Sequence, residues 1–116
     1  MKLDNTGAAT AFQRMDPASA DSTNYRWKNP MTMDENNDNV LYWSERNKIW
    51  RHNTLSSIPY NNSNDKSNFG WDFFSDSLQT QMDITTLNSS INPPDILYFG
   101  TSSKYMYRID NASVGD

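Results

Sequence analysis

An internal repeat constrains this 116-residue chain more than any other feature of its sequence. Residues 39–53 read NVLYWSERNKIWRHN, and residues 95–111 read DILYFGTSSKYMYRIDN. Each segment has Leu, Tyr and a large aromatic in succession, then a polar stretch with a lysine, then an aromatic followed by arginine. Leu41 and Leu97 set the spacing at 56 residues. The repeated segments lack a 3.6-residue apolar period, which favours short strands over stacked helical hairpins.

The length of the repeat predicts the fold class. Repeats of about 40 to 50 residues built of short strands are typical of propeller blades, and extra loop length accounts for the larger spacing here. We therefore expect an all-β chain of antiparallel β-propeller blades, a fragment of a larger propeller. Residues 1–28 would end a preceding blade, 29–82 would form a first blade, and 83–116 an incomplete second blade whose last strand lies beyond residue 116.

Short runs bounded by turn residues give the expected strands. The turns themselves are marked by DENND at residues 34–38 and NPPD at residues 92–95, where Asn, Asp and Pro favour tight turns. The predicted strands are Thr10–Met15 in the preceding blade, Pro30–Met33, Asn39–Ser44, Lys48–His52 and Trp71–Phe74 in the first, and Ile84–Leu87, Ile96–Gly100 and Tyr105–Asp110 in the second.

Composition agrees with a turn-rich β protein. The chain contains 15 Asn, 14 Ser and 9 Thr, which favour turns and loops over helix interiors.

A net charge of -4 without a run of Lys or Arg excludes nucleic acid as an expected partner. No apolar stretch approaches the roughly 20 residues of a transmembrane helix, and the start lacks the apolar region of a signal peptide. The chain is thus expected to be cytosolic, or an internal or processed piece of an exported protein.

The second repeat carries a family resemblance. Its ILYFGTSSKYMYRIDN resembles the YxGTSxGxxYRxDN pattern of large secreted propellers of Bacteroidota, in the broad group of BNR and sortilin-like repeats. Lys104 stands where that pattern has glycine. The resemblance covers residues 10–116 and implies export, commonly by the type IX route, to the cell surface or the medium.

One stretch matches the calcium-loop pattern. Asp34, Asn36, Asp38 and Glu45 fall at its positions one, three, five and twelve, with Asn39 in place of the turn glycine. A strand is expected over residues 40–43, where the pattern requires a loop. We therefore expect an Asx-rich β-turn here and assign no metal ligand.

The aromatic and arginine residues of the repeat have two interpretations each. Because they recur at equivalent places, the aromatics are expected in the core between blades, with a stacking platform for a sugar or peptide as the alternative. Arg51 and Arg108 are expected to pair with a carboxylate or carbonyl, with an anionic ligand as the alternative. The recurring aromatics are Tyr42, Trp43, Trp50, Tyr98, Phe99 and Tyr107.

Candidate catalytic groups show no organising spacing. His52, the single histidine, is expected to be an exposed residue at a strand end. The sequons at Asn61, Asn88 and Asn111 are consistent with surface turns. A glycosidase needs two facing carboxylates, but no spacing selects a pair among the aspartates. These aspartates are Asp34, Asp38, Asp72, Asp76, Asp83 and Asp95.

The sequence therefore predicts a non-catalytic, extracellular or cell-surface module that serves as a binding or scaffold element. No catalytic, cofactor-binding or metal residue is assigned. The alternative is part of a carbohydrate-active propeller enzyme whose site lies on further blades. Expected partners are further blades of the same polypeptide, another protein chain, a carbohydrate or a surface protein. We also expect the aromatics Trp43, Trp50, Phe99 and Tyr107 to be left without cover in the isolated chain, which would make it insoluble or associated.

Overall fold

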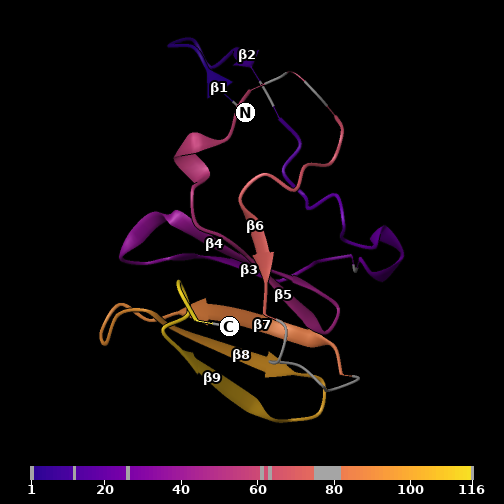
Figure 1. Cartoon of the computed structure of the whole chain (residues 1–116), viewed down its shortest axis with the longest axis vertical. Helices are drawn as coiled ribbons and strands as arrows, with labels where there is room; N and C mark the ends of the chain where they lie inside the picture. The colour runs from indigo at the N-terminus through magenta and orange to yellow at the C-terminus, as the bar shows by residue number, and fades with distance from the viewer. Residues whose placement is uncertain are drawn as a thin grey trace.

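The protein is an all-β chain in a computed structural model that describes residues 2–11, 13–25, 27–60, 62, 64–74 and 82–115 (Figure 1). Two 3-10 turns, η1 (Ser22–Asn24) and η2 (Leu55–Ser57), interrupt the strands. Across these residues no helix is long and apolar enough to cross a membrane. The strands are β1 (Lys2–Leu3), β2 (Ala9–Ala11), β3 (Met31–Asp34), β4 (Asn37–Glu45), β5 (Lys48–His52), β6 (Trp71–Phe73), β7 (Ile84–Ser89), β8 (Ile96–Thr101) and β9 (Met106–Asp110).

The first repeat forms a four-stranded antiparallel sheet in the order β3-β4-β5-β6. The predicted pairing of residues 39–44 with residues 48–52 is confirmed, with Trp43 opposite Trp50. A two-residue turn at Arg46 and Asn47 joins these strands, and Arg46 adopts a positive φ of 52°. The sheet is thus a simple meander, as the short strands and turn residues predict.

The second repeat forms a three-stranded antiparallel sheet in the order β7-β8-β9. The predicted pairing of residues 96–100 with residues 105–110 is confirmed, although β9 begins at Met106. Tyr98 lies opposite Arg108, just as Tyr42 lies opposite Arg51 in the first sheet. The two sheets therefore share strand order and register.

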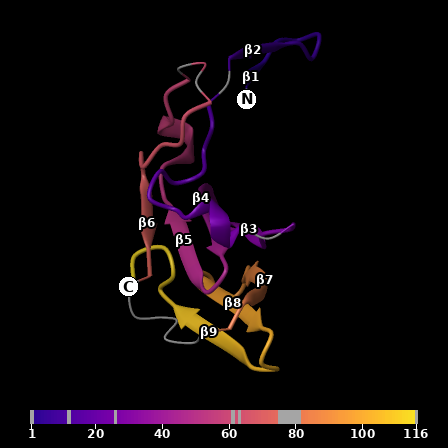
Figure 2. The same ribbon diagram turned by 90° about the vertical axis from the view of Figure 1, so that its right-hand side faces the viewer.

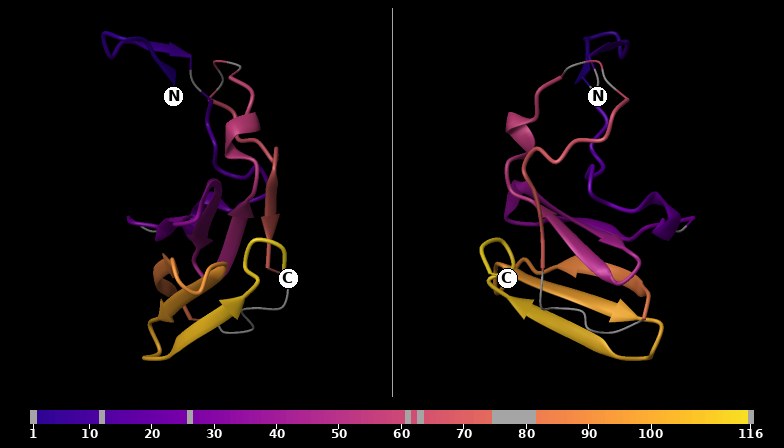
Figure 3. Two further views of the ribbon diagram at one scale, coloured as in Figure 1. Left: turned by 90° about the vertical axis from the view of Figure 1, so that its left-hand side faces the viewer. Right: turned by 45° about the vertical axis from the view of Figure 1, so that its right-hand side comes forward.

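The two sheets stack face to face, as two views of the ribbon show (Figure 3). The strands β3 and β7, which open the two units, lie close together. Side chains from both sheets fill the space between the layers and form one hydrophobic core. The buried core residues are Val40, Tyr42, Ile49 and Phe74 of the first unit and Ile84, Leu87, Leu97, Phe99 and Ala112 of the second.

Equivalent strands contribute opposite faces to this core. On β4 the core residues are Val40 and Tyr42, whereas on β8 the core residues are Leu97 and Phe99, which correspond to Leu41 and Trp43. Side chains alternate along a strand, so one sheet packs through one of its faces and the next sheet through the other. This alternation is what a stack of identical sheets requires.

The N-terminal segment departs from the prediction. Thr10–Met15 was expected to form the outer strand of a preceding blade, but β2 ends at Ala11 and pairs with β1 in a separate two-stranded sheet. Figure 2 shows this hairpin projecting away from the two stacked sheets. The residues that follow this hairpin instead cross one face of the first sheet and cover part of it.

Candidate interaction surfaces

Four sheet faces can be named from the registers. The first sheet has a strap face (Met31, Met33, Leu41, Trp43, Trp50) and a core face (Thr32, Tyr42, Ile49, Arg51). The second sheet has a core face (Leu87, Leu97, Phe99, Tyr107) and an open face (Asn88, Tyr98, Met106, Arg108). The two core faces meet. By the 56-residue repeat, the strap face corresponds to the core face of the second sheet, and the open face corresponds to the core face of the first.

Residues 13–25, here called the strap, cover part of the strap face. The indole N–H of Trp71 donates to the Met15 carbonyl. The Tyr25 ring meets the Trp43 ring edge-on, with centroids 5.2 Å apart. The buried Glu45 accepts a hydrogen bond from the Asp21 amide at 2.9 Å. These contacts anchor the strap against β4 and β6.

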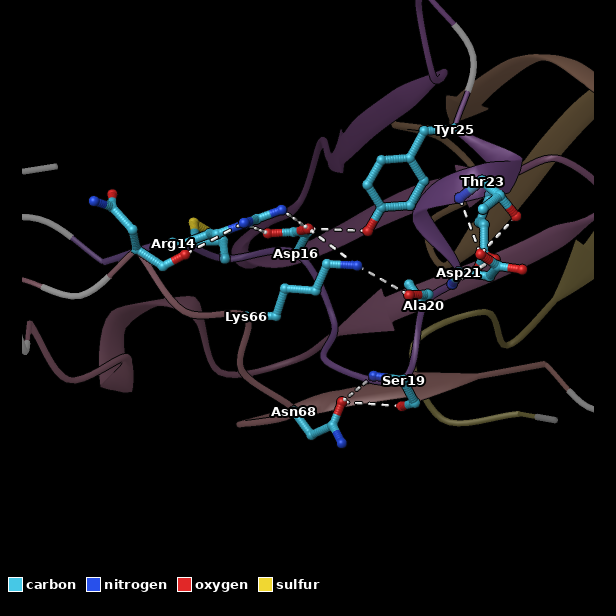
Figure 4. Close-up of polar contacts among 12 residues, drawn as sticks. Arg14, Asp16, Ser19, Ala20, Asp21, Thr23, Tyr25, Lys66 and Asn68 are labelled. Carbon is cyan, nitrogen blue, oxygen red and sulfur yellow. Dashed lines mark hydrogen bonds and ion pairs between the residues drawn. The ribbon is translucent and has the colours of Figure 1, made fainter.

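A charged cluster holds the strap to the loop that precedes β6 (Figure 4). The Asp16 carboxylate accepts hydrogen bonds from Arg14 and from the Tyr25 hydroxyl, and Lys66 lies 3.9 Å away. Burial alone would raise the pKa of Asp16, but the bonds from Arg14 and Tyr25 outweigh it, and the pKa is lowered. Because the Asp16 carboxylate is held by three of the protein's own side chains, we interpret the cluster as structural.

The strap leaves an apolar groove over β3 and β4. The groove encloses about 690 Å³. Its exposed floor includes Met31 (62% exposed) and Met33. Methionine is flexible and polarizable, and it adapts to apolar partners of differing shape. The groove is lined mainly by Met15, Met31, Met33, Leu41, Leu55, Ile58 and Tyr60.

The open face is the second candidate surface. Met106 is 74% exposed and Arg108 is exposed, whereas the corresponding Ile49 and Arg51 of the first sheet are 0% and 7% exposed. Tyr98 is half-buried on the same face. The same positions are therefore buried in one unit and open to solvent in the next.

The calcium-loop residues do not converge. The Asp34 carboxylate accepts the Asn36 amide at 2.8 Å, and the Asn36 side chain donates to the Ser90 and Ile91 carbonyls. Glu45 lies at the other end of β4, roughly 26 Å along the strand, and binds the Trp50 indole N–H at 2.9 Å. In the part of the chain that the structure describes, no three acidic, His or Cys groups gather as a metal site would need.

The prediction for His52 is wrong, because the side chain is fully buried. Its ring meets the Trp71 ring edge-on at 5.2 Å, and Phe69 lies on another side with centroids 6.4 Å apart. The Thr54 amide donates to Nδ1 at 3.2 Å, while Nε2 makes no hydrogen bond to the described residues. Burial lowers the pKa of His52. His52 is buried because β6 pairs with β5 and brings Trp71, and Phe69 just before the strand, against the ring.

Three of the aspartates considered as glycosidase acids have hydrogen-bond or ion-pair partners of their own. Asp72 pairs with Arg51, and Asp83 pairs with Arg46 at 3.2 Å. Asp95 accepts the Ser113 amide at 2.7 Å. Asp38 is exposed near the groove. Asp76 lies outside the described residues.

Two of the sequon asparagines can be placed. Asn88 is exposed within strand β7 rather than in a turn, while Asn111 is exposed in the turn after β9. Asn61 lies outside the described residues.

The repeated aromatics divide between the core and the strap face. Tyr42 and Phe99 are core residues, and Tyr107 stacks on Phe99 with centroids 5.1 Å apart. Trp50 is also buried, against Phe73 on the strap face. The expectation that Trp50 and Phe99 lack cover within the chain is therefore wrong, because sequence reasoning did not find the strap or the stacking of the second sheet.

Arg51 makes the contacts expected of it. Its guanidinium pairs with Asp72 and donates to the Ala112 and Gly115 carbonyls at 2.8 and 2.6 Å. These bonds fasten the turn after β9 to the first sheet. Arg108 pairs with Asp110 on its own strand.

The fold and these surfaces define a class, an all-β protein of small antiparallel sheets with two solvent-facing surfaces. No protein-family model, curated protein or solved structure matches the chain. Function must therefore be inferred from the surfaces themselves.

Proposed function

We propose that this chain is a non-catalytic β-repeat module of the propeller type, which acts as a binding or scaffold element by docking further β-sheet units. One observation carries the proposal. The core face of the second sheet covers Tyr42 and Ile49, which lie on the core face of the first sheet. The open face of the second sheet is equivalent to that core face of the first, but no sheet among the described residues covers its Tyr98 and Met106. The open face is where a next unit, from the same polypeptide or another protein, would pack.

The physical basis is that of other repeat architectures. A repeat unit cannot bury both faces of its sheet alone, so neighbouring units supply the missing contacts. An exposed apolar patch rimmed by polar groups is a common mark of an interaction site. Met106 and the half-buried Tyr98 supply the apolar part here, and Arg108 supplies a charge that can select an acidic or carbonyl-rich partner.

The exported location is part of the same proposal. It is supported by the motif in residues 96–111, which resembles the Bacteroidota surface propellers with BNR and sortilin-like repeats. Protease treatment of intact source cells tests it. Degradation of the protein before lysis supports the surface location, and protection until lysis contradicts it. No observation among the described residues favours the carbohydrate-active alternative.

The docking role can be tested by sedimentation velocity. An exposed docking face brings copies of the chain together when no other unit is supplied. We expect the sedimentation coefficient to rise with concentration for the native chain and to rise less for Met106→Glu. Met82→Glu is the matched control, because Met82 is also an exposed methionine but lies outside the sheets. Equal behaviour of the two variants contradicts a docking role for the open face.

A further inference from the structure

The outer edge of β9 differs from the corresponding edge of β5. In the first sheet, β5 lies between β4 and β6, whereas β9 pairs only with β8 among the described residues. The Phe74 amide donates to the Ile49 carbonyl at 3.1 Å, so Ile49 directs its backbone groups toward the β6 side. Along a strand, the backbone N–H and C=O groups of successive residues point alternately to its two edges. The equivalent Met106, and Arg108 two residues on, therefore direct theirs to the free edge of β9.

The strand that fills this place in the first sheet has a definite chemistry. β6 reads Trp71, Asp72, Phe73. Asp72 lies opposite Arg51 and forms an ion pair with it. On the other face, Phe73 contacts Trp50 with centroids 5.2 Å apart. A carboxylate thus pairs with the arginine, and flanking aromatics pack on the side chains before and after it.

β9 presents the same pattern without that strand. Tyr107 and Ile109 lie on its core face, and Arg108 lies on the open face. The Arg108 Nε donates to Asp110 at 2.6 Å, but both side chains are more than half exposed. An ion pair held in water contributes little and exchanges readily for another. Arg108 is therefore able to turn to an incoming carboxylate.

We infer that the free edge of β9 binds an extended segment whose sequence alternates aromatic, carboxylate, aromatic. The segment adds antiparallel to β9 by β-strand addition, with its carboxylate opposite Arg108 and its aromatics beside Tyr107 and Ile109. Backbone hydrogen bonds supply the attachment, and the arginine supplies selectivity. This inference rests on the proposed equivalence of the two sheets, but it concerns the strand edge and not the open face.

The test supplies such a segment on the full chain. A flexible Gly/Ser linker and a copy of residues 67–74 are added after residue 115, which raises the effective concentration of the strand. Amide hydrogen exchange is then measured at Met106 and Arg108 by NMR. We expect exchange at these two amides to slow at least tenfold, as strand pairing requires. Docking of a sheet on the open face does not pair these amides, so the two proposals fail separately.

Charge variants test the selectivity. Asp72→Lys in the added copy alone should abolish the protection, and so should Arg108→Glu alone. Combining the two changes should restore it, because the charges are then exchanged across the pair. Unchanged exchange with the native copy overturns the inference. Protection that is equal in all variants also overturns it, because the edge would then accept any strand.

Discussion

Arg51 of β5 and Arg108 of β9 occupy equivalent positions, each opposite the tyrosine of the preceding strand, yet one is buried and the other exposed. Arg51 is enclosed by Asp72, by the Phe74 ring 4.9 Å from its guanidinium carbon, and by the turn after β9. For Arg108, the described residues supply only Asp110 as an ion-pair partner. A further sheet packed on the open face is expected to enclose Arg108 as Arg51 is enclosed in the first sheet.

This difference predicts unequal costs for the same substitution. Arg51→Met should destabilise the chain by about 2–4 kcal/mol, because it removes charge-assisted hydrogen bonds to two carbonyls and to Asp72. Arg108→Met should have no measurable effect, since its ion pair lies in solvent. Urea unfolding of both variants at low protein concentration measures the two free energies of unfolding. Similar losses for both would show that the two environments do not differ as described.

The β8–β9 turn offers a stabilising change. Lys104 adopts a φ of 73°, in the left-handed region that favours glycine. Lys104→Gly should therefore raise the free energy of unfolding by about 0.5–1 kcal/mol after the entropy cost in the unfolded chain is included. Lys104→Ala is the control, because it removes the charge but keeps Cβ, and it should bring no gain. A gain with alanine would assign the effect to the lysine charge and not to the backbone.

The strand pattern could be predicted from the sequence, because short alternating runs bounded by Asn, Asp and Gly carry a local signal. Seven strands of the two repeats were found near their observed ends, and both central pairings are confirmed. Lys104, which stands where the resembled pattern has glycine, adopts a positive φ in the structure.

Burial could not be predicted in the same way, because it depends on which sheet face meets which. The repeat aligns Trp43 with Phe99, but only Phe99 lies in the core between the sheets. His52 reads as a strand-end polar residue, and its burial depends on Trp71 and Phe69, which lie 19 and 17 residues further along the chain. The strap was missed because residues 13–15 were assigned to a predicted strand, and residues 16–25 carry no strand period and act through individual contacts such as Asp16 with Tyr25.

Gly70 should be intolerant of a side chain. Its φ is 71°, and an added Cβ would lie 2.6 Å from two atoms of the His52 ring. Gly70→Ala should cost at least about 2 kcal/mol, from backbone strain and overpacking together. Gly7→Ala is the matched control, since Gly7 also has a positive φ (86°) but has no atom within 4 Å of the added Cβ. Thermal unfolding compares them, and an equal loss for both would contradict the predicted contact with His52.

His52 should make stability depend on pH. Burial lowers its pKa in the folded chain below the ordinary value of about 6.5. The unfolded chain therefore takes up the proton first, so stability is fully present above pH 6.5 and declines as the pH falls below it. His52→Phe should flatten this decline between about pH 7 and pH 5. Urea midpoints across that range measure the slope, and a slope that persists in the variant would assign the dependence to other groups.

The two sheets are proposed to be equivalent units, with an open face that accepts a third. The most direct measurement is the free energy of unfolding of a chain extended after residue 115 by a copy of residues 54–115. Docking of the added unit should raise the stability of the second unit by at least about 2 kcal/mol, as nearest-neighbour contacts do in repeat proteins. It should also bury Tyr98 and Met106. The same extension with Leu97→Lys and Phe99→Lys in the added copy should leave Met106 exposed and lose this gain, because its core face cannot pack, and should keep only what pairing of the added copy of Trp71–Phe73 with β9 contributes. A native extension that leaves the stability unchanged and Met106 open to solvent would contradict the account.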